Sequence, residues 1–262
     1  MNDASGPVSE SPASANGALS ASVALARRRR ALLLLIAALL TLWTLWATVV
    51  LPSLPPLEGW RQIVRSITVR VALWIVPCSI YARSVGLKMT LLPWYFGLPP
   101  TARHWLVSIG TTLAAGIAVS FDVARKLALP PAAVWAMLLH AEPSVPIPEF
   151  FEELVFRGIL LNELLAVLPS RSLPRNGLDS VMLLPSERSR FWWANLATSL
   201  VFMGLHWPWW IYTDGISAVF LMKSGGVFLI SLVLGMLFVR SRSLWPCVAL
   251  HWLNNALSSL AP

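Results

Sequence analysis

Apolar residues in this chain form long runs rather than the short alternating patterns of half-buried strands. A run of about 20 apolar residues is long enough for a helix to cross a bilayer. Runs of roughly this length predict seven spanning helices, at residues 31–51, 67–82, 104–120, 149–168, 191–212, 216–239 and 244–260. The apolar segment 127–141 is short and flanked by prolines, so we expect it to be interfacial or re-entrant. The pattern predicts an all-α fold, a polytopic transmembrane bundle of about seven to eight helices.

Composition supports a membrane protein and excludes a soluble globular domain. The 262 residues are 56% hydrophobic and 12% charged, with a mean hydropathy of +0.67, whereas soluble domains are about 25% charged. The net charge of +8 does not indicate nucleic-acid binding, because basic residues of membrane proteins gather in cytoplasmic loops. The expected partners are the lipid bilayer and a membrane-anchored substrate, with no nucleic acid. The oligomeric state is left open.

The chain divides into a tail and one membrane domain. Residues 1–26 are rich in Ala, Ser, Gly and Pro, which predicts a disordered N-terminal tail. Residues 27–262 show no internal repeat and form a single predicted transmembrane domain, whose polar motifs lie within 149–260. Cys78 and Cys247 lie in apolar stretches and have no metal-binding spacing and no disulfide framework. We expect no cofactor and no metal in the site.

The distribution of basic residues predicts an orientation. With the N-terminus in the cytoplasm, the outer loops hold only Arg61, Arg65, Arg125 and Lys126. The inner segments hold Arg27, Arg28, Arg29, Arg30, Arg83, Lys88, Arg103, Arg171, Arg175, Arg188, Arg190, Arg240 and Arg242. The excess on the inner side favours a multi-pass membrane protein with a cytoplasmic N-terminus.

The first candidate motif opens the predicted helix 149–168. Glu153 and Arg157 are four residues apart, so they share a helix face and can form an ion pair. Glu152 is rotated about 100° from that face and has no local cationic partner, which suits a general base. Glu149 lies in the first turn, where the helix dipole favours an acid without any further function.

Two further polar motifs lie on apolar helices. The segment Phe202-x-x-x-His206 places an imidazole in the span 191–212, and His251-x-x-x-Asn255 places two polar groups on one face of the last span. Alone, each motif also fits a structural role, as an interfacial histidine or as polar contacts between helices. Together with Glu152 they fall in the outer half of the bilayer on three helices and could meet in one hydrated cavity. We interpret Arg70, His104, His140 and Lys223 as structural, interfacial or snorkelling residues.

These three motifs, in this order on apolar helices, resemble the CPBP family of CAAX-protease and bacteriocin-processing intramembrane endopeptidases. The resemblance covers about 150 to 260. It implies a helical, glutamate-dependent protease in which Glu152 and His206 activate water while Glu153 and Arg157 hold the first motif in place. It also implies that His251 and Asn255 form the oxyanion hole. The expected reaction is hydrolysis of a peptide bond near a membrane-anchored C-terminal segment.

Other functions fit the same residues. Glu152, His206 and His251 could be ligands of a zinc-dependent intramembrane hydrolase. A non-catalytic immunity or scaffold protein would keep the fold without the reaction, and a proton-coupled transporter would also use buried Glu and His residues. Within the protease hypothesis, the predicted outward-facing site favours a prokaryotic member that sorts surface proteins over one that processes prenylated cytosolic tails.

Overall fold

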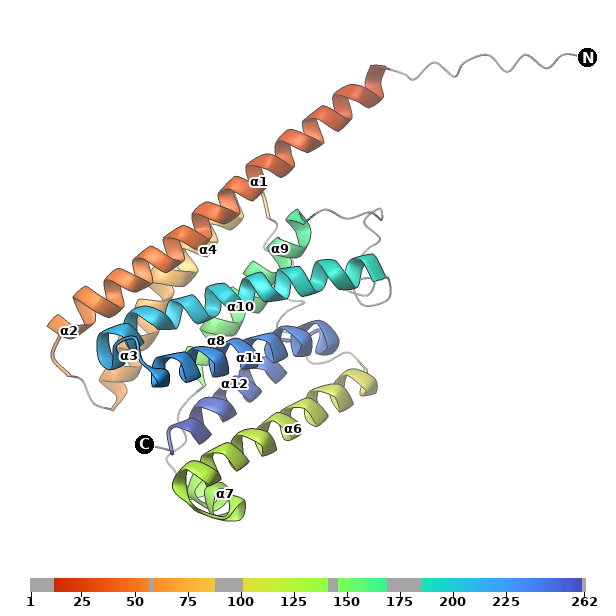
Figure 1. The fold of residues 1–262 in the computed structure, drawn as a ribbon. Helices are drawn as coiled ribbons and strands as arrows, with labels where there is room; N and C mark the ends of the chain where they lie inside the picture. The colour runs from red at the N-terminus through yellow and green to blue at the C-terminus, as the bar shows by residue number, and fades with distance from the viewer. Residues whose placement is uncertain (1–11, 57–58, 88–100, 141–145, 169–184, 261–262) are drawn as a thin grey trace, which may run out of the picture.

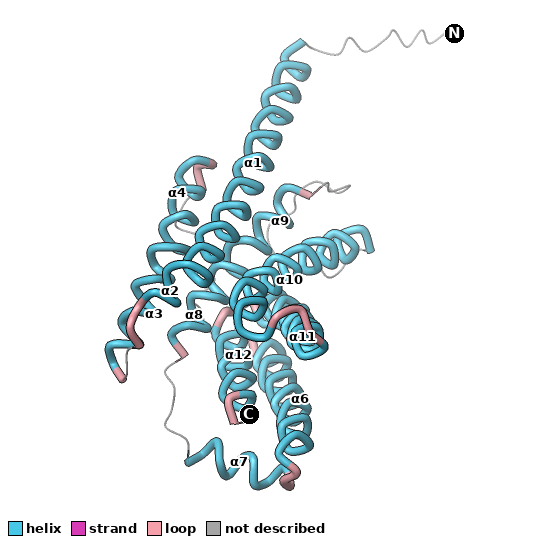
Figure 2. Tube along the Cα trace, turned by 60° about the vertical axis from the view of Figure 1, so that its left-hand side comes forward, coloured by secondary structure: helices cyan, strands magenta, loops and turns pink. Residues whose placement is uncertain are grey.

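The computed structural model describes residues 12–56, 59–87, 101–140, 146–168 and 185–260, and it confirms the predicted fold class. These residues form eight helices and no strands. Figure 2 shows helices joined by loops throughout the described part of the chain. Four helices are long and apolar enough to cross a membrane, at Ser22–Ser53, Trp60–Ser84, Ala102–Leu127 and Ala218–Ser241.

The first two helices each contain a widened π-helical turn next to a proline. The first helix consists of α1 (Pro12–Leu45), η1 (Trp46–Val50) and α2 (Leu51–Ser53), and the second of α3 (Trp60–Arg70), η2 (Val71–Ile75) and α4 (Val76–Ser84). Pro52 and Pro77 each stand two residues after the last residue of a π turn. A proline ring clashes with the carbonyl four residues earlier and lacks a donor, so widening the preceding turn lets the helix continue.

Helix α1 begins within the segment predicted as a tail. Its first residue is Pro12, whereas the composition predicts disorder through residue 26. Alanine is frequent in this segment and has the highest helix propensity, so the segment can extend a helix that is anchored further on by packing. Residues 1–11 lie outside the described part of the chain.

The remaining helices follow the predicted order. They are α6 (Ala102–Leu127), α7 (Pro131–His140), the continuous helix of α8 (Ile147–Glu153), η4 (Leu154–Leu161) and α9 (Asn162–Val167), α10 (Pro185–Asp214), α11 (Ala218–Ser241) and α12 (Trp245–Ser258). All seven predicted spans are therefore helical. The helices at 147–167, 185–214 and 245–258 carry the candidate site residues and do not belong to the four long apolar ones.

The helix at 147–167 lies at the centre of the bundle. One apolar cluster joins it to α1, α4 and α10, through residues such as Leu39, Tyr81 and Phe156. A second cluster joins it to α10, α11 and α12. Large apolar side chains such as Leu34, Leu106 and Leu221 are instead 65–72% exposed on the outside, as expected for surfaces that face lipid. In Figure 1, α8 lies behind α10, between α1 and α12.

Helix α7 does not cross the bundle. Its ten residues rise only about 15 Å, half the thickness of a hydrocarbon core. Val134 packs with Val123 and Ala124 near the end of α6 and with Leu257 near the end of α12. The ends of α6 and α12 thus share one side with α7, in agreement with the expectation that 127–141 does not span.

Helices α10 and α11 approach each other closely at Gly235. A Cβ atom at this position would lie 1.8 Å from Asn195 Oδ1. The Asn195 side chain is buried and donates from Nδ2 to the Leu232 carbonyl at 3.0 Å. The glycine therefore provides the space in which this interhelical hydrogen bond forms.

We expect Gly235→Ala to destabilise the protein by about 1–3 kcal/mol, because the added methyl group displaces Asn195. The matched control is Gly226→Ala on the same helix, where a Cβ atom meets nothing within 4 Å. Thermal unfolding of the purified variants in detergent measures the difference. Equal melting temperatures for both variants would contradict the close packing at Gly235.

Candidate active site

The local sequence brings three glutamates to the start of the central helix. Pro146 precedes this helix and Pro148 occupies its first turn, where a missing backbone donor is tolerated. Glu149, Glu152 and Glu153 follow within two turns and are all buried, with exposed fractions of 8%, 8% and 0%. Buried carboxylates need charged or hydrogen-bonded partners, and other helices supply them.

Glu153 forms the predicted ion pair with Arg157. Arg157 Nε lies 3.2 Å from Glu153 Oε2, and Nη1 donates to Oε1 at 3.2 Å. Arg157 Nη2 also donates to Ser231 on α11, to its carbonyl at 2.9 Å and its Oγ at 2.8 Å. The pair thus connects the central helix to α11 and holds the start of this helix in place.

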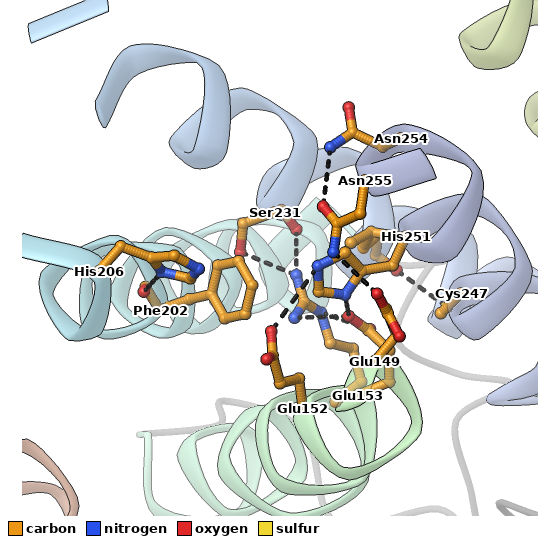
Figure 3. Close-up of polar contacts among 12 residues, drawn as sticks. Glu149, Glu152, Glu153, Phe202, His206, Ser231, Cys247, His251, Asn254 and Asn255 are labelled. Atoms are coloured by element: carbon orange, nitrogen blue, oxygen red, sulfur yellow. Dashed lines mark hydrogen bonds and ion pairs between the residues drawn. The ribbon is translucent and has the colours of Figure 1, made fainter. Parts of the chain in front are cut away.

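His251 lies between two of the glutamates (Figure 3). Its Nδ1 is 2.9 Å from Glu153 Oε1, and its Nε2 is 3.7 Å from Glu152 Oε2. The imidazole is 3% exposed. Helix α12 is therefore joined to the first motif by a side chain that contacts both neighbouring carboxylates.

Asn255 contacts Glu149, a residue for which the sequence indicated only a favourable helix start. Asn255 Nδ2 donates to Glu149 Oε1 at 3.0 Å. Glu149 thus has a tertiary partner on α12, one helical turn beyond His251. In this arrangement both side chains expected at the oxyanion hole are engaged by glutamates.

Glu152 has a cationic partner, which corrects the sequence-based expectation. Arg70 Nη2 donates to Glu152 Oε1 at 3.1 Å, and the two side chains are 16% and 10% exposed. From the sequence alone, Arg70 is interpreted as a structural, interfacial or snorkelling residue, and the structure instead pairs it with Glu152. Its presence in an apolar helix was the only signal of a buried partner, since an intramembrane cation is costly.

His206 and Glu152 line one cavity. Its volume is about 160 Å³, and Arg70 lies in the same wall. The rest of the wall is mainly aromatic: Trp43, Trp74, Phe156, Phe202, Trp209 and Trp210. His206 Nδ1 is 2.9 Å from the Phe202 carbonyl. A carbonyl only accepts hydrogen bonds, so Nδ1 carries the proton, and a neutral His206 presents Nε2 as an acceptor.

The motif residues are therefore close together but do not all face the cavity. Glu152 and His206 line it, whereas His251 and Asn255 do not. Figure 3 shows the Phe202 ring between the two imidazoles; its centre is 4.9 Å from His206 and 5.6 Å from His251. Phe202 thus separates the cavity from the ion-pair cluster of Glu153, Arg157 and His251.

The remaining polar residues of the spans have local roles. His104 Nδ1 contacts Thr101 Oγ1 at the start of α6, and Lys223 pairs with Asp214 at 2.6 Å. The side chain of His140 lies outside the described residues. The described residues include no group of three or more His, Cys, Asp or Glu that could hold a metal ion, so the structure gives no support to the proposed zinc ligand set.

Together, the helical bundle, its four membrane-span candidates and the buried Glu, His and Arg side chains are those of an integral membrane protein with a buried polar site. Residues 130–257 match the family model described as type II CAAX prenyl endopeptidase Rce1-like. This stretch of the chain is therefore similar to a CAAX-type endopeptidase domain, which supports the resemblance to the CPBP family. This family consists of membrane proteases. No curated protein and no solved structure is similar enough to match the chain.

We expect Arg157→Met to destabilise the protein strongly, by about 3–5 kcal/mol, because it leaves Glu153 as a buried charge with a lost partner. The control is Arg125→Met, which removes the exposed i,i+3 contact of Arg125 with Asp122 and should have little effect. The folded fraction after detergent extraction and the melting temperature test both variants. If Arg157→Met were as stable as Arg125→Met, the buried ion pair would not hold the helix.

Proposed function

We propose that this protein is an intramembrane endopeptidase that hydrolyses a peptide bond near a membrane-anchored C-terminal segment of its substrate. The observation that carries the proposal is the cavity that Glu152 and His206 share. Its volume of about 160 Å³ is enough for a few water molecules, each of which takes about 30 Å³. The CAAX-type protease family of the domain supports the same reaction class.

The proposed chemistry begins with a water molecule between the two side chains. It donates one hydrogen bond to Glu152 and one to Nε2 of His206, which orients an oxygen lone pair for attack. Glu152 then takes the proton as a general base, a role that contributes about 10²–10⁴ in rate. The protonated Glu152 returns this proton to the amide nitrogen when the C–N bond breaks.

The resemblance also implies roles for the other motif residues. Glu153 and Arg157 hold the first motif, as their ion pair and the bonds to Ser231 support. His251 and Asn255 belong to the proposed site, and an oxyanion role requires that they exchange their present glutamate partners for substrate. His251 also orients Glu152, because its Nε2 faces this carboxylate at 3.7 Å.

We further propose a cytoplasmic N-terminus in a prokaryotic cell membrane, with the cavity toward the outer side. Basic side chains meet at the end of the bundle opposite the site. Arg28 forms an ion pair with Glu163 at 2.8 Å, and Arg29 and Arg190 donate to carbonyls of α9. A cluster of Arg at this end is typical of the cytoplasmic side.

Glu152→Gln should abolish cleavage while the protein still inserts and folds, because the amide keeps the shape of the carboxyl group but cannot accept the proton. Two reporters test this: a fluorogenic peptide with an S-prenylated C-terminal tetrapeptide, and a protein with a C-terminal transmembrane anchor. The rate is measured with the reporter that the wild-type protein cleaves.

The matched control is Glu163→Gln. Glu163 is also a buried glutamate and lies on the same helix, about 16 Å from Glu152 along the helix axis. Glu163 does not line the cavity, so the activity per folded molecule should be unchanged. Wild-type cleavage by Glu152→Gln would refute the role of this residue, and cleavage of neither reporter by the wild type would refute the proposed function.

The proposed orientation predicts the accessibility of introduced cysteines. Cys78 and Cys247 are buried and should give little background labelling. Ile216, between α10 and α11, is 80% exposed, and Ser189 near the other end of α10 is also exposed. In intact cells, an impermeant maleimide should label Ile216→Cys and should reach Ser189→Cys only after permeabilisation. The opposite result would place the N-terminus outside.

A further inference from the structure

Arg70 is held in a defined position at the wall of the cavity. It ends α3, and its Nη1 donates to Ser66 Oγ at 2.5 Å while Nη2 donates to Glu152. The guanidinium carbon lies 5.8 Å from the centre of the Trp43 ring and 5.4 Å from that of Trp74. Two aromatic faces and two hydrogen bonds thus fix the orientation of the cation.

This guanidinium has donor capacity that the described residues leave unused. Its Nε is buried and has no hydrogen-bond partner in the described part of the chain. A guanidinium presents five N–H donors in a rigid plane. Arg70 also lines an adjoining cavity of about 280 Å³, and the two cavities share Trp43, Arg70 and Trp209. Arg70 therefore lies between the two cavities, so a peptide bound in the cavity of about 280 Å³ would pass Arg70 to reach Glu152.

The side chains expected at the oxyanion hole are placed differently. Asn255 donates to Glu149, and both ring nitrogens of His251 face carboxylates. Neither residue lines the cavity that Glu152 and His206 share. Of the described residues in the wall of that cavity, Arg70 carries the positive charge.

We propose that Arg70 is a catalytic residue that stabilises the oxyanion formed on the substrate carbonyl. This inference rests on the proposed function and assigns a catalytic group to the N-terminal half of the chain, outside the matched residues 130–257. With Arg70, the proposed active site includes residues of α3 in addition to those of α8, α10 and α12.

The charge balance of the reaction explains why an arginine beside the base is useful. When water attacks, its O–H bond breaks and the proton moves to Glu152, which becomes neutral. The new C–O bond pushes the carbonyl electron pair onto oxygen, so the negative charge moves from Glu152 to the oxyanion. A guanidinium that contacts both sites keeps a counter-charge throughout. When the C–N bond breaks, the proton leaves Glu152 for the amine and the original ion pair returns.

The test compares Arg70→Gln and Arg70→Lys in the full-length protein, with the S-prenylated fluorogenic peptide or the anchored reporter as substrate. Arg70→Gln should lower kcat by about 10²–10³ with little change in KM, which is the effect of removing one oxyanion donor. Arg70→Lys keeps the charge and should lose less. Arg61→Gln is the control, because Arg61 lies on the same helix and is exposed.

A binding measurement separates this role from a structural one. A phosphinic peptide carries a negative charge in tetrahedral geometry, whereas the hydroxyethylene isostere has the same shape and no charge. Arg70→Gln should weaken phosphinate binding by at least about tenfold and leave hydroxyethylene binding unchanged. An equal loss for both ligands, or wild-type kcat in Arg70→Gln, would overturn the proposal. If Glu152→Gln is inactive in the same assay, the proposed function still stands.

Discussion

The architecture of the site depends on the neutralisation of charge inside an apolar bundle. Glu153 has no exposed surface, and it lies against Arg157 and His251. An unpaired charge in an apolar interior costs several kcal/mol. Separating Glu153 from Arg157 and His251 would incur this cost, so the three side chains stay in contact. Because Arg157 binds Ser231 and His251 belongs to α12, the same cluster fixes α11 and α12 against the central helix. Because Glu152 is next to Glu153 on the central helix, the same contacts also determine the position of Glu152.

Phe202 divides the site into a cavity and a cluster of ion pairs. Its ring lies between the imidazoles of His206 and His251, and the Arg157 guanidinium lies 5.0 Å from the ring centre. Glu152 and His206 are on the cavity side. Glu153, Arg157 and His251 are packed away from the cavity. An apolar ring between them excludes water from the ion pairs, which keeps these interactions strong.

Whether an interaction can be predicted from the sequence depends on how far apart its two residues are along the chain. The helices and the pair Glu153–Arg157 depend on local periodicity, and both were predicted. Arg70 with Glu152 and Asn255 with Glu149 pair across 82 and 106 residues, and no local pattern encodes such distances. The family resemblance could not supply Arg70 either, because the matched domain begins at residue 130. The cost of a buried arginine is the one physical signal in the sequence, and it fits a snorkelling side chain as well as one with a buried partner.

The N-terminal half of the chain therefore does more than anchor the domain in lipid. Glu163, near the far end of the central helix, accepts two hydrogen bonds from Arg28 and one from Tyr81, while Arg70 holds Glu152 near the other end. Both ends of this helix are thus tied to the first two helices by buried carboxylates. Trp43 and Trp74 from the same helices complete the cavity wall. A domain limited to residues 130–257 would lack this wall and the cation beside Glu152, so the cavity requires both halves of the chain.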